Sequence, residues 1–304
     1  MSSLEMLFQK LDEEIVLLDG AMGTMIQQHK LEEKDFRNKV FEDHPKPLKG
    51  NNDLLSITRP QLIEQIHADY LEAGARILET NTCNANRISQ QDYSLGAYVE
   101  QLNRASVDAA RHAVHRFEQD HPGEKVWIAG TIGPTNRTCS LSPDVQDPAY
   151  RALEFDEIAE AYLEQARVLM DAGADLLLFE TTFDTLNLKA GIYAVEKLND
   201  ATGQRTPVML SVTITDASGR TLSGQTLEAF YLSVMHAQPL AVCINCALGA
   251  MEMRPFIEEL SRISRFRVGV YPNAGLPNSM GEYDQSPREF VGIMQEFASQ
   301  GWVN

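Results

Sequence analysis

Short apolar segments alternate with longer amphipathic segments along almost the entire 304-residue chain. This alternation is typical of βα units, in which parallel strands form one sheet and helices pack against it. Seven candidate strands precede a final Trp302-Val303-Asn304 segment, and a closed barrel of this kind has eight strands. We therefore predict an α/β fold, a (β/α)8 TIM-type barrel that forms one domain over residues 1–304 and is interrupted inside its eighth strand. The seven predicted strands are Ile15–Asp19, Ile77–Thr80, Val126–Gly130, Leu176–Thr181, Val208–Thr213, Ala241–Asn245 and Arg267–Tyr271.

The segments between these strands carry helix signals. In Gln61–Leu71 the apolar residues recur on one face of a helix. Thr58 lies three residues before Gln61, the spacing of a capping box at a helix start. Gly74 and Gly173 each stand in an Ala-Gly-Ala sequence between a helical segment and a strand. Both glycines are predicted to end a helix, because glycine adopts the left-handed conformation that closes it.

The chain is acidic, with 43 Asp and Glu residues against 26 Lys and Arg residues and a formal net charge of −17. Such a charge repels phosphate groups, which argues against nucleic acid and anionic membranes as partners. No segment approaches the ~18 apolar residues that a membrane-spanning helix needs, and the N-terminus lacks a secretory signal pattern. The four cysteines are too few and too unevenly spaced for a disulfide framework. A cytoplasmic protein with reduced thiols is expected.

Carboxylates stand at the ends of three predicted strands, where barrels of this kind place their reactive residues. Asp19, Glu79 and Glu180 each close a buried strand, a costly position for a charge that has no partner. Any one of them alone could be a structural carboxylate bonded to a neighbouring loop. Three at one rim favour a site for a cationic group such as an ammonium. The irregular, charged stretch His29–Asn52 is expected to be a loop near this mouth.

Two glycines follow the first of these carboxylates. Gly20 and Gly23 would allow backbone N–H groups to approach a small anion, although an ordinary strand-to-loop turn explains the pair equally well. Carboxylates for an ammonium and backbone amides for a carboxylate together suit an amino acid as ligand.

Cys243-Ile-Asn-Cys246 has the spacing of a metal-binding or redox pair. Residues three apart in a strand face opposite sides, so both thiols cannot readily meet one metal ion. A redox pair would need a helix N-terminus. Cys246, at the strand end, is therefore the better ligand candidate and Cys243 a core residue, while the reading in which neither binds metal remains open. No serine-nucleophile, phosphate-loop or dinucleotide motif is present.

The strand-end motifs together resemble the homocysteine S-methyltransferases, and among them the N-terminal homocysteine-binding module of cobalamin-dependent methionine synthases. The resemblance spans nearly the whole chain in order. GPTNRT, DASGRTLSGQT and DFR (35–37) point to the cobalamin-dependent branch. The segments that carry it are LLDGAMGTMIQ (17–27), LKGNNDLL (48–55), ETNTCNAN (79–86), GTIGPTNRTCSLSPDV (130–145), FETTFDTLNLK (179–189), VTITDASGRTLSGQT (212–226), NCALG (245–249) and PNAGLPN (272–278).

This resemblance implies a zinc-dependent methyl transfer to homocysteine that gives methionine. Cys246 matches the cysteine ligand of the family's NC motif, and two adjacent cysteines at the end of the eighth strand complete the protein ligands. Zinc would deprotonate the homocysteine thiol and leave it nucleophilic. Asp19 and Glu180 match the acids that hold the substrate ammonium, and the amides of Gly20, Ala21 and Met22 match its carboxylate contact. No further catalytic residue is implied.

No adjacent cysteine pair occurs in these 304 residues. The two further zinc ligands are thus expected beyond Asn304, and this chain alone is expected to lack a competent zinc site and methyl transfer. Cys83 and Cys139, which also follow strands, could replace them only in principle. Folate and cobalamin modules are absent, so cobalamin would belong to a partner module. The alternatives are a stand-alone homocysteine methyltransferase with a sulfonium or betaine donor, and a non-catalytic amino-acid-binding remnant.

Overall fold

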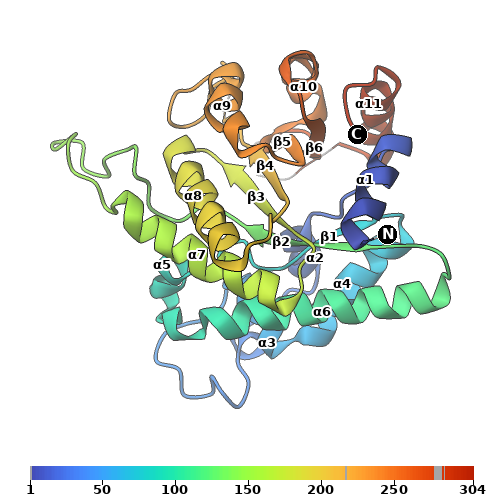
Figure 1. Ribbon diagram of the computed structural model, residues 1–304. Coiled ribbons are helices and arrows are strands. Elements are labelled where there is room, and N and C mark those ends of the chain that lie inside the picture. Colours follow the sequence, from blue (N-terminus) through green and yellow to red (C-terminus); the bar gives the residue numbers. More distant parts are fainter. Residues whose placement is uncertain (1, 216–217, 277–282, 284) are drawn as a thin grey trace.

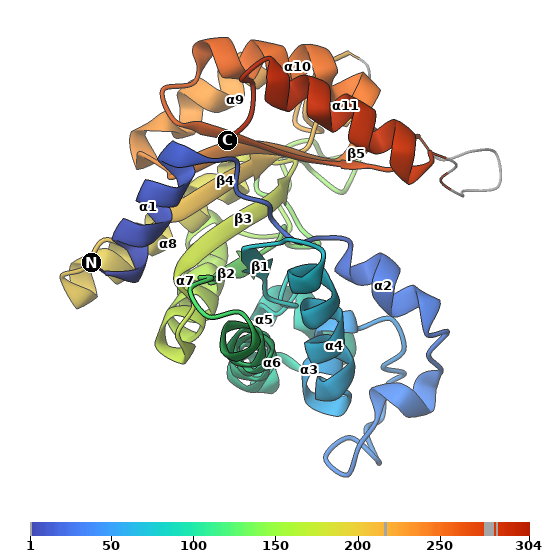
Figure 2. The ribbon, with the colours of Figure 1, turned by 90° about the vertical axis from the view of Figure 1, so that its right-hand side faces the viewer.

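The computed structural model describes residues 2–215, 218–276, 283 and 285–304, so parts of the motif segments 212–226 and 272–278 lie outside it. Six parallel strands form one sheet in chain order, each hydrogen-bonded to the next (Figure 1). The sheet curls, and helices surround its outer face (Figures 1 and 2). This α/β arrangement is a large part of the predicted TIM-type barrel. The strands are β1 (Ile77–Glu79), β2 (Trp127–Ile132), β3 (Leu176–Thr182), β4 (Val208–Val212), β5 (Ala241–Gly249) and β6 (Arg267–Asn273).

The predicted helical segments form helices that follow the strands around the sheet. Neighbours in the series α4, α6, α7, α8, α9, α10 and α11 contact one another. The α-helices are α1 (Ser3–Glu13), α2 (Met22–Gln28), α3 (Leu55–Thr58), α4 (Pro60–Glu72), α5 (Arg87–Gln90), α6 (Val99–Asp120), α7 (Phe155–Ala172), α8 (Thr185–Thr202), α9 (Leu227–Val234), α10 (Ala250–Ile263) and α11 (Pro287–Ser299). Short 3₁₀ turns occupy Glu33–Phe36, Asn52–Leu54, Gln91–Tyr93, Gly96–Tyr98 and Met235–Ala237.

The predicted helix ends are partly confirmed. Gly173 ends α7 with φ of 101°, and Gly74 follows the last residues of α4 with φ of 111°. The predicted capping box at α4 is wrong. The helix is capped at Arg59 without a side-chain hydrogen bond, and the Thr58 hydroxyl donates to the Leu54 carbonyl instead. Thr58 is the last residue of the short helix α3, so its hydroxyl is satisfied within that preceding turn.

Strand alternation divides the buried residues into two layers, because successive side chains point to opposite faces. Residues on the outer face of the strands pack with the surrounding helices in the largest apolar cluster, which includes Leu78, Leu177, Leu210 and Val242. Residues on the inner face form a second cluster with α1, whose Leu7 is fully buried there. The inner cluster consists of Leu7, Ile77, Trp127, Ala129, Leu176, Leu178, Met209, Leu240, Ala241 and Cys243.

Helix α1 therefore covers the amino end of the curled sheet. The Trp127 indole N–H donates to the Ser3 carbonyl at 2.9 Å, and Arg267 pairs with Asp12. The amino end is thus apolar and filled, which leaves the carboxyl end of the strands as the open side. The C-terminus lies beside α1 in both views (Figures 1 and 2), and Val16 N, just after this helix, donates to the Asn304 carbonyl at 2.9 Å.

The predicted first strand, Ile15–Asp19, does not form a regular strand. It makes a single parallel bridge, Leu18 to Ile77, although the Asp19 N–H also bonds the Ile77 carbonyl at 2.9 Å. On its other side it has one backbone hydrogen bond, from Val16 N to the Asn304 carbonyl. A regular strand needs several bridges in series, and this segment makes one bridge on one side and one hydrogen bond on the other. The predicted eighth strand is likewise no strand. Asn304 nevertheless bridges β6 and this segment, since its N–H donates to the Val268 carbonyl at 2.9 Å.

All four cysteines, Cys83, Cys139, Cys243 and Cys246, are free thiols. Among the described residues, none of the helices combines the length and the apolar character that a bilayer span requires.

Two helix glycines offer a matched test of the packing. A Cβ at Gly191 in α8 would lie 2.4 Å from Phe179 Cε1, whereas a Cβ at Gly292 in α11 would meet nothing within 4 Å. Gly191→Ala should lower the free energy of unfolding by about 1–3 kcal/mol through overpacking. Gly292→Ala should raise it by up to about 1 kcal/mol through helix propensity. Urea denaturation measures both, and equal effects of the two substitutions would contradict the packing of α8 on β3.

Candidate active site

The inner face of the strands changes from apolar to polar toward the carboxyl end. The positions that continue the inner cluster, two residues further along each strand, are Glu79 on β1, Glu180 on β3 and Asn245 on β5. Tyr271 occupies the same face of β6 and packs against the cluster. Because the strands are parallel, these side chains meet at one mouth, as the strand-end carboxylates predicted.

Two acids dominate the electrostatics of this mouth. The Glu79 Oε1 atom is buried and has no hydrogen-bond partner. Burial raises the pKa of Glu79 well above its ordinary value, and the nearby charges of Glu180 and Asp19 raise it further. Burial also raises the pKa of Glu180 to about 7, partly offset by a hydrogen bond from the Cys83 thiol. Carboxyl groups that lie close together favour their protonated forms, and a nearby cation would allow them to ionise.

Asp19 lies beside this pair but is held from two directions. Its Oδ1 atom accepts a hydrogen bond from the Glu79 N–H at 2.7 Å, and His67 Nδ1 on α4 lies 3.4 Å from Oδ2. Asp19 is 6% exposed and His67 is fully buried. Burial raises the pKa of Asp19, while His67 and the Glu79 amide act in the opposite direction.

Backbone irregularities determine the directions of the side chains at two strand ends. The β3–β4 pairing shifts register between Phe179 and Thr182, and the β5–β6 pairing shifts between Asn245 and Gly249. Thr181 has φ of 56°, and Cys246 and Ala247 have φ of 58° and 59°. Non-glycine residues rarely adopt this conformation and need surrounding contacts to hold it.

Asn245 supplies those contacts. Its buried side-chain Oδ1 accepts from Thr181 N at 3.1 Å and from the Ser211 hydroxyl at 2.6 Å. Its Nδ2 donates to Thr181 Oγ1 at 3.0 Å and to Cys246 Sγ at 3.1 Å. One amide thus joins β3, β4 and β5, and it fixes Cys246 next to the turn that follows Glu180.

Cys246, the predicted metal ligand, is partly exposed and also lies 3.7 Å from Thr181 Oγ1. Burial raises its thiol pKa. Cys243, predicted as a core residue, is fully buried in the inner cluster. In the described part of the chain no three His, Cys, Asp or Glu side chains are arranged to hold a metal ion. Cys246 alone therefore does not fit a zinc ion, and neither Cys83 nor Cys139 completes a site.

The predicted carboxylate contact, Gly20 to Met22, forms the turn into α2, in which Ala21 is exposed and Gly20 and Met22 are partly buried. Ala21 has φ of 48° and caps α2 without a side-chain hydrogen bond. The N–H groups of these three residues donate to no other residue that the structure describes. No described residue therefore competes for these N–H groups.

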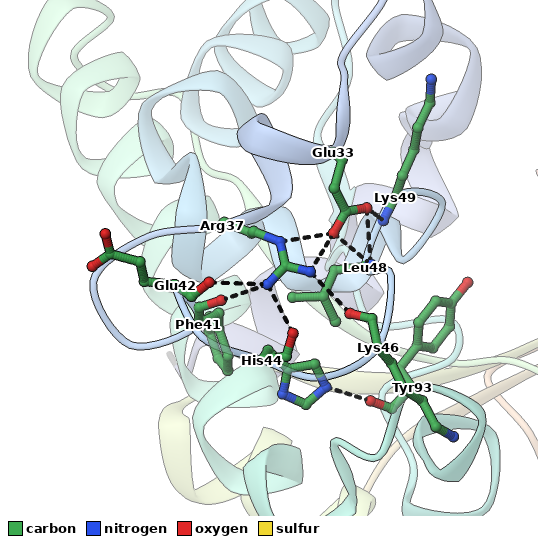
Figure 3. A network of polar contacts seen from close by, with 9 residues as sticks. All are labelled: Glu33, Arg37, Phe41, Glu42, His44, Lys46, Leu48, Lys49 and Tyr93. Carbon is green, nitrogen blue, oxygen red and sulfur yellow. Dashed lines mark hydrogen bonds and ion pairs between the residues drawn. The ribbon is translucent and has the colours of Figure 1, made fainter.

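The long segment His29–Asn52 is built around one arginine (Figure 3). The Arg37 guanidinium bonds the Glu33 carboxylate and the carbonyls of Phe41, Glu42, His44 and Lys46 at 2.8–3.2 Å. At the end of this segment, the Asn52 carbonyl accepts a hydrogen bond from Asn81 Nδ2, just beyond β1, at 2.8 Å. The loop therefore reaches the side of the mouth, as expected.

Sequence reasoning missed three contributors to this site. His67 lies on a helix face that reads as ordinary core, and Asn245 is overshadowed by the cysteine beside it. Tyr271 lies two residues before the end of β6, and its hydroxyl is buried near Ser211. The strand alternation that points Glu79 inward could have identified Tyr271 by the same count.

Comparison with known proteins agrees with this architecture. The sequence pattern of the homocysteine S-methyltransferase family matches residues 16–304. The chain belongs to this family. Among solved structures it is similar to the homocysteine methyltransferase MmuM from Escherichia coli in its oxidized form, with a TM-score of 0.74, 23% identity, and coverage of 99% of this chain and 92% of that chain. The metallated form of MmuM matches with a TM-score of 0.70 and 24% identity over 90% of this chain and 88% of that chain.

At these identities the structural matches establish the shared fold alone. Family membership makes the protein a homocysteine methyltransferase by class, which agrees with the resemblance of its strand-end motifs. The methionine synthase branch and the individual site residues are matters for proposal.

The raised pKa of Glu180 predicts a pH-dependent stability. The folded chain keeps a proton up to about pH 7 that the unfolded chain releases near pH 4.5. Stability is therefore greatest below that window and falls as pH rises through it, by about 1 kcal/mol per pH unit. Urea unfolding of the ligand-free chain between pH 5 and 8 measures this slope. Glu180→Gln should reduce this slope, although Glu79 and Asp19 keep their own contributions, and the exposed Glu228→Gln should not change it. A slope that Glu180→Gln leaves unchanged would contradict the assignment.

Proposed function

We propose that this chain binds homocysteine at the carboxyl end of its strands and presents the homocysteine sulfur for methylation. In this proposal it is the homocysteine-binding module of a methionine synthase, in which a methyl group passes from methyltetrahydrofolate through cobalamin to give methionine. The observation that carries the proposal is the acidic mouth of a member of the homocysteine S-methyltransferase family, whose acids pair with no lysine or arginine among the described residues.

Substrate contacts follow from the charges. The homocysteine ammonium would lie against Glu180 and Asp19, with Glu79 next to them, because a positive charge allows these crowded acids to ionise. The substrate carboxylate would meet the N–H groups of Gly20, Ala21 and Met22. Cys246, held by Asn245 beside the turn after Glu180, marks the sulfur end of the site.

The reaction requires only a small set of changes at the substrate. The homocysteine thiol loses its proton, a new sulfur–carbon bond forms, and the bond between the methyl group and its donor breaks. The residues of this chain bind and orient the amino acid for that step. Cys246 would give one thiolate to a metal ion, and the remaining ligands are proposed to come from outside these 304 residues. Cobalamin and folate are proposed to reside on partner modules.

A second candidate is a stand-alone homocysteine methyltransferase that takes its methyl group from a small sulfonium or betaine. The fold that this chain shares with MmuM over 99% of its length is compatible with this candidate. The two candidates differ in the methyl donor and share the homocysteine site. A non-catalytic amino-acid-binding protein would keep the ammonium contacts and use neither donor.

Homocysteine binding tests the shared part of the proposal. Titration calorimetry of the 304-residue chain with reduced L-homocysteine should give one site per chain. Asp19→Asn and Glu180→Gln should each weaken binding about 10- to 100-fold, since each removes a charge-assisted contact worth roughly 1.5–3 kcal/mol. Glu164→Gln, which breaks only the surface pair with Arg87, is the matched control. Wild-type affinity in both site variants would refute these roles.

Zinc titration tests the metal ligand separately. A single thiolate cannot form the three-ligand site of a catalytic zinc, so we expect the purified chain to bind zinc weakly and to lose it to a mild chelator. Cys246→Ser should weaken even this binding, while Cys139→Ser should not. Tight one-to-one binding that survives chelation would contradict the proposal that further ligands come from elsewhere.

A further inference from the structure

Beneath the acidic mouth lies a histidine that the proposed substrate contacts do not use. His67 is on α4, on the helical side of the junction between the Ile15–Asp19 segment and β1, and its side chain is fully buried. Its Nε2 has no hydrogen-bond partner within the described residues, and its Nδ1 has only the 3.4 Å contact with Asp19 Oδ2. A buried imidazole normally bonds at least once, so the position of this ring calls for an explanation.

Among the described residues, Asp19 is the charged group within ion-pair distance of the ring. His67 Nδ1 lies 3.4 Å from Asp19 Oδ2, while the opposite oxygen, Oδ1, accepts the Glu79 N–H at 2.7 Å. The carboxylate is therefore held at both ends, one by β1 and one by α4. With both oxygens engaged, its plane has little freedom to rotate.

The remaining groups around Asp19 offer no other cation. Glu79 on β1 and Glu180 on β3 are both acids, and the Asp19 charge raises the pKa of each. Burial raises the pKa of Tyr70 on α4, and the charges of Asp19 and Glu79 raise it further. No lysine or arginine in the described ranges forms an ion pair with Asp19, Glu79 or Glu180. An acid buried among other acids tends to take up a proton, and a protonated Asp19 would be a poor partner for an ammonium.

We infer that His67 is a positioning residue that keeps Asp19 ionised and correctly oriented for the ammonium group of an amino-acid substrate. The inference rests on the proposed function only in naming that ammonium. The interaction between His67 and Asp19 is a property of the ligand-free chain. His67 itself lies on α4, outside the sheet, and makes none of the proposed substrate contacts.

The first test needs no substrate. Infrared difference spectroscopy of the 304-residue chain follows carboxyl protonation with pH, and the Asp19 band is the one that Asp19→Asn removes. His67→Leu, which keeps the volume and removes the donor, should move the Asp19 midpoint upward by about one pH unit, a tenfold loss of ionised form at a given acidic pH. His67→Asn, which retains an N–H near the Nδ1 position, should restore part of that shift.

The matched control is Ile63→Val, a change of similar burial one turn earlier on α4, which should leave the midpoint unchanged. An unchanged midpoint in folded His67→Leu would overturn the inference. If that variant does not fold, the imidazole nitrogen resonances of His67 can be compared in wild type and Asp19→Asn. A change supports the interaction, and identical resonances overturn it.

The second test uses substrate. His67→Leu should weaken L-homocysteine binding by up to about tenfold at a pH below the Asp19 midpoint and much less at a pH above it, and it should add nothing in an Asp19→Asn background. A merely structural role would weaken binding equally at both values and in both backgrounds. A wild-type chain that binds no homocysteine would overturn the proposed function. The inference would then stand or fall on the infrared midpoint.

Discussion

The parallel pairing of six strands is the constraint on which the rest of this structure depends. Parallel strands in one sheet bring all of their carboxyl ends to the same side. Because α1 covers the opposite end with apolar contacts, the polar side chains of Glu79, Glu180 and Asn245 gather at the carboxyl end. The acids stand close together because the strands do, and their raised pKa values follow from that crowding and from burial.

A second level of organisation comes from irregular backbone at two strand ends. Regular alternation would turn Cys246 away from the inner face that Asn245 occupies. The register shift after Asn245, with left-handed φ at Cys246, returns the thiol to the Asn245 amide and to Thr181. The cost of three left-handed residues, about 1–3 kcal/mol each, is offset by the four hydrogen bonds of one buried amide. The amine end and the sulfur end of the proposed site are thereby held by one side chain.

Much of the fold could be predicted from the sequence, for a definite reason. Strand and helix patterns repeat with periods of 2 and about 3.6 residues, and the six central strands and their helices follow those patterns closely. The failures occur where pairing partners decide the outcome. Ile15–Asp19 has the composition of a strand but makes one bridge, because its second neighbour supplies a single backbone contact at Asn304. At Thr58 the preceding turn competed successfully for the hydroxyl.

The candidate site divides in the same way. The sequence by itself determined which residue types stand at the strand ends, and it determined that no second thiol lies next to Cys246, because strand order, local spacing and cysteine content are properties of the linear chain. Only the tertiary structure decided that His67 on α4 lies against Asp19, which is far from it in the sequence. It also decided that Asn245 joins three strands. Such contacts depend on how elements pack and on which buried atoms remain without partners, and neither can be read from a pattern along the chain.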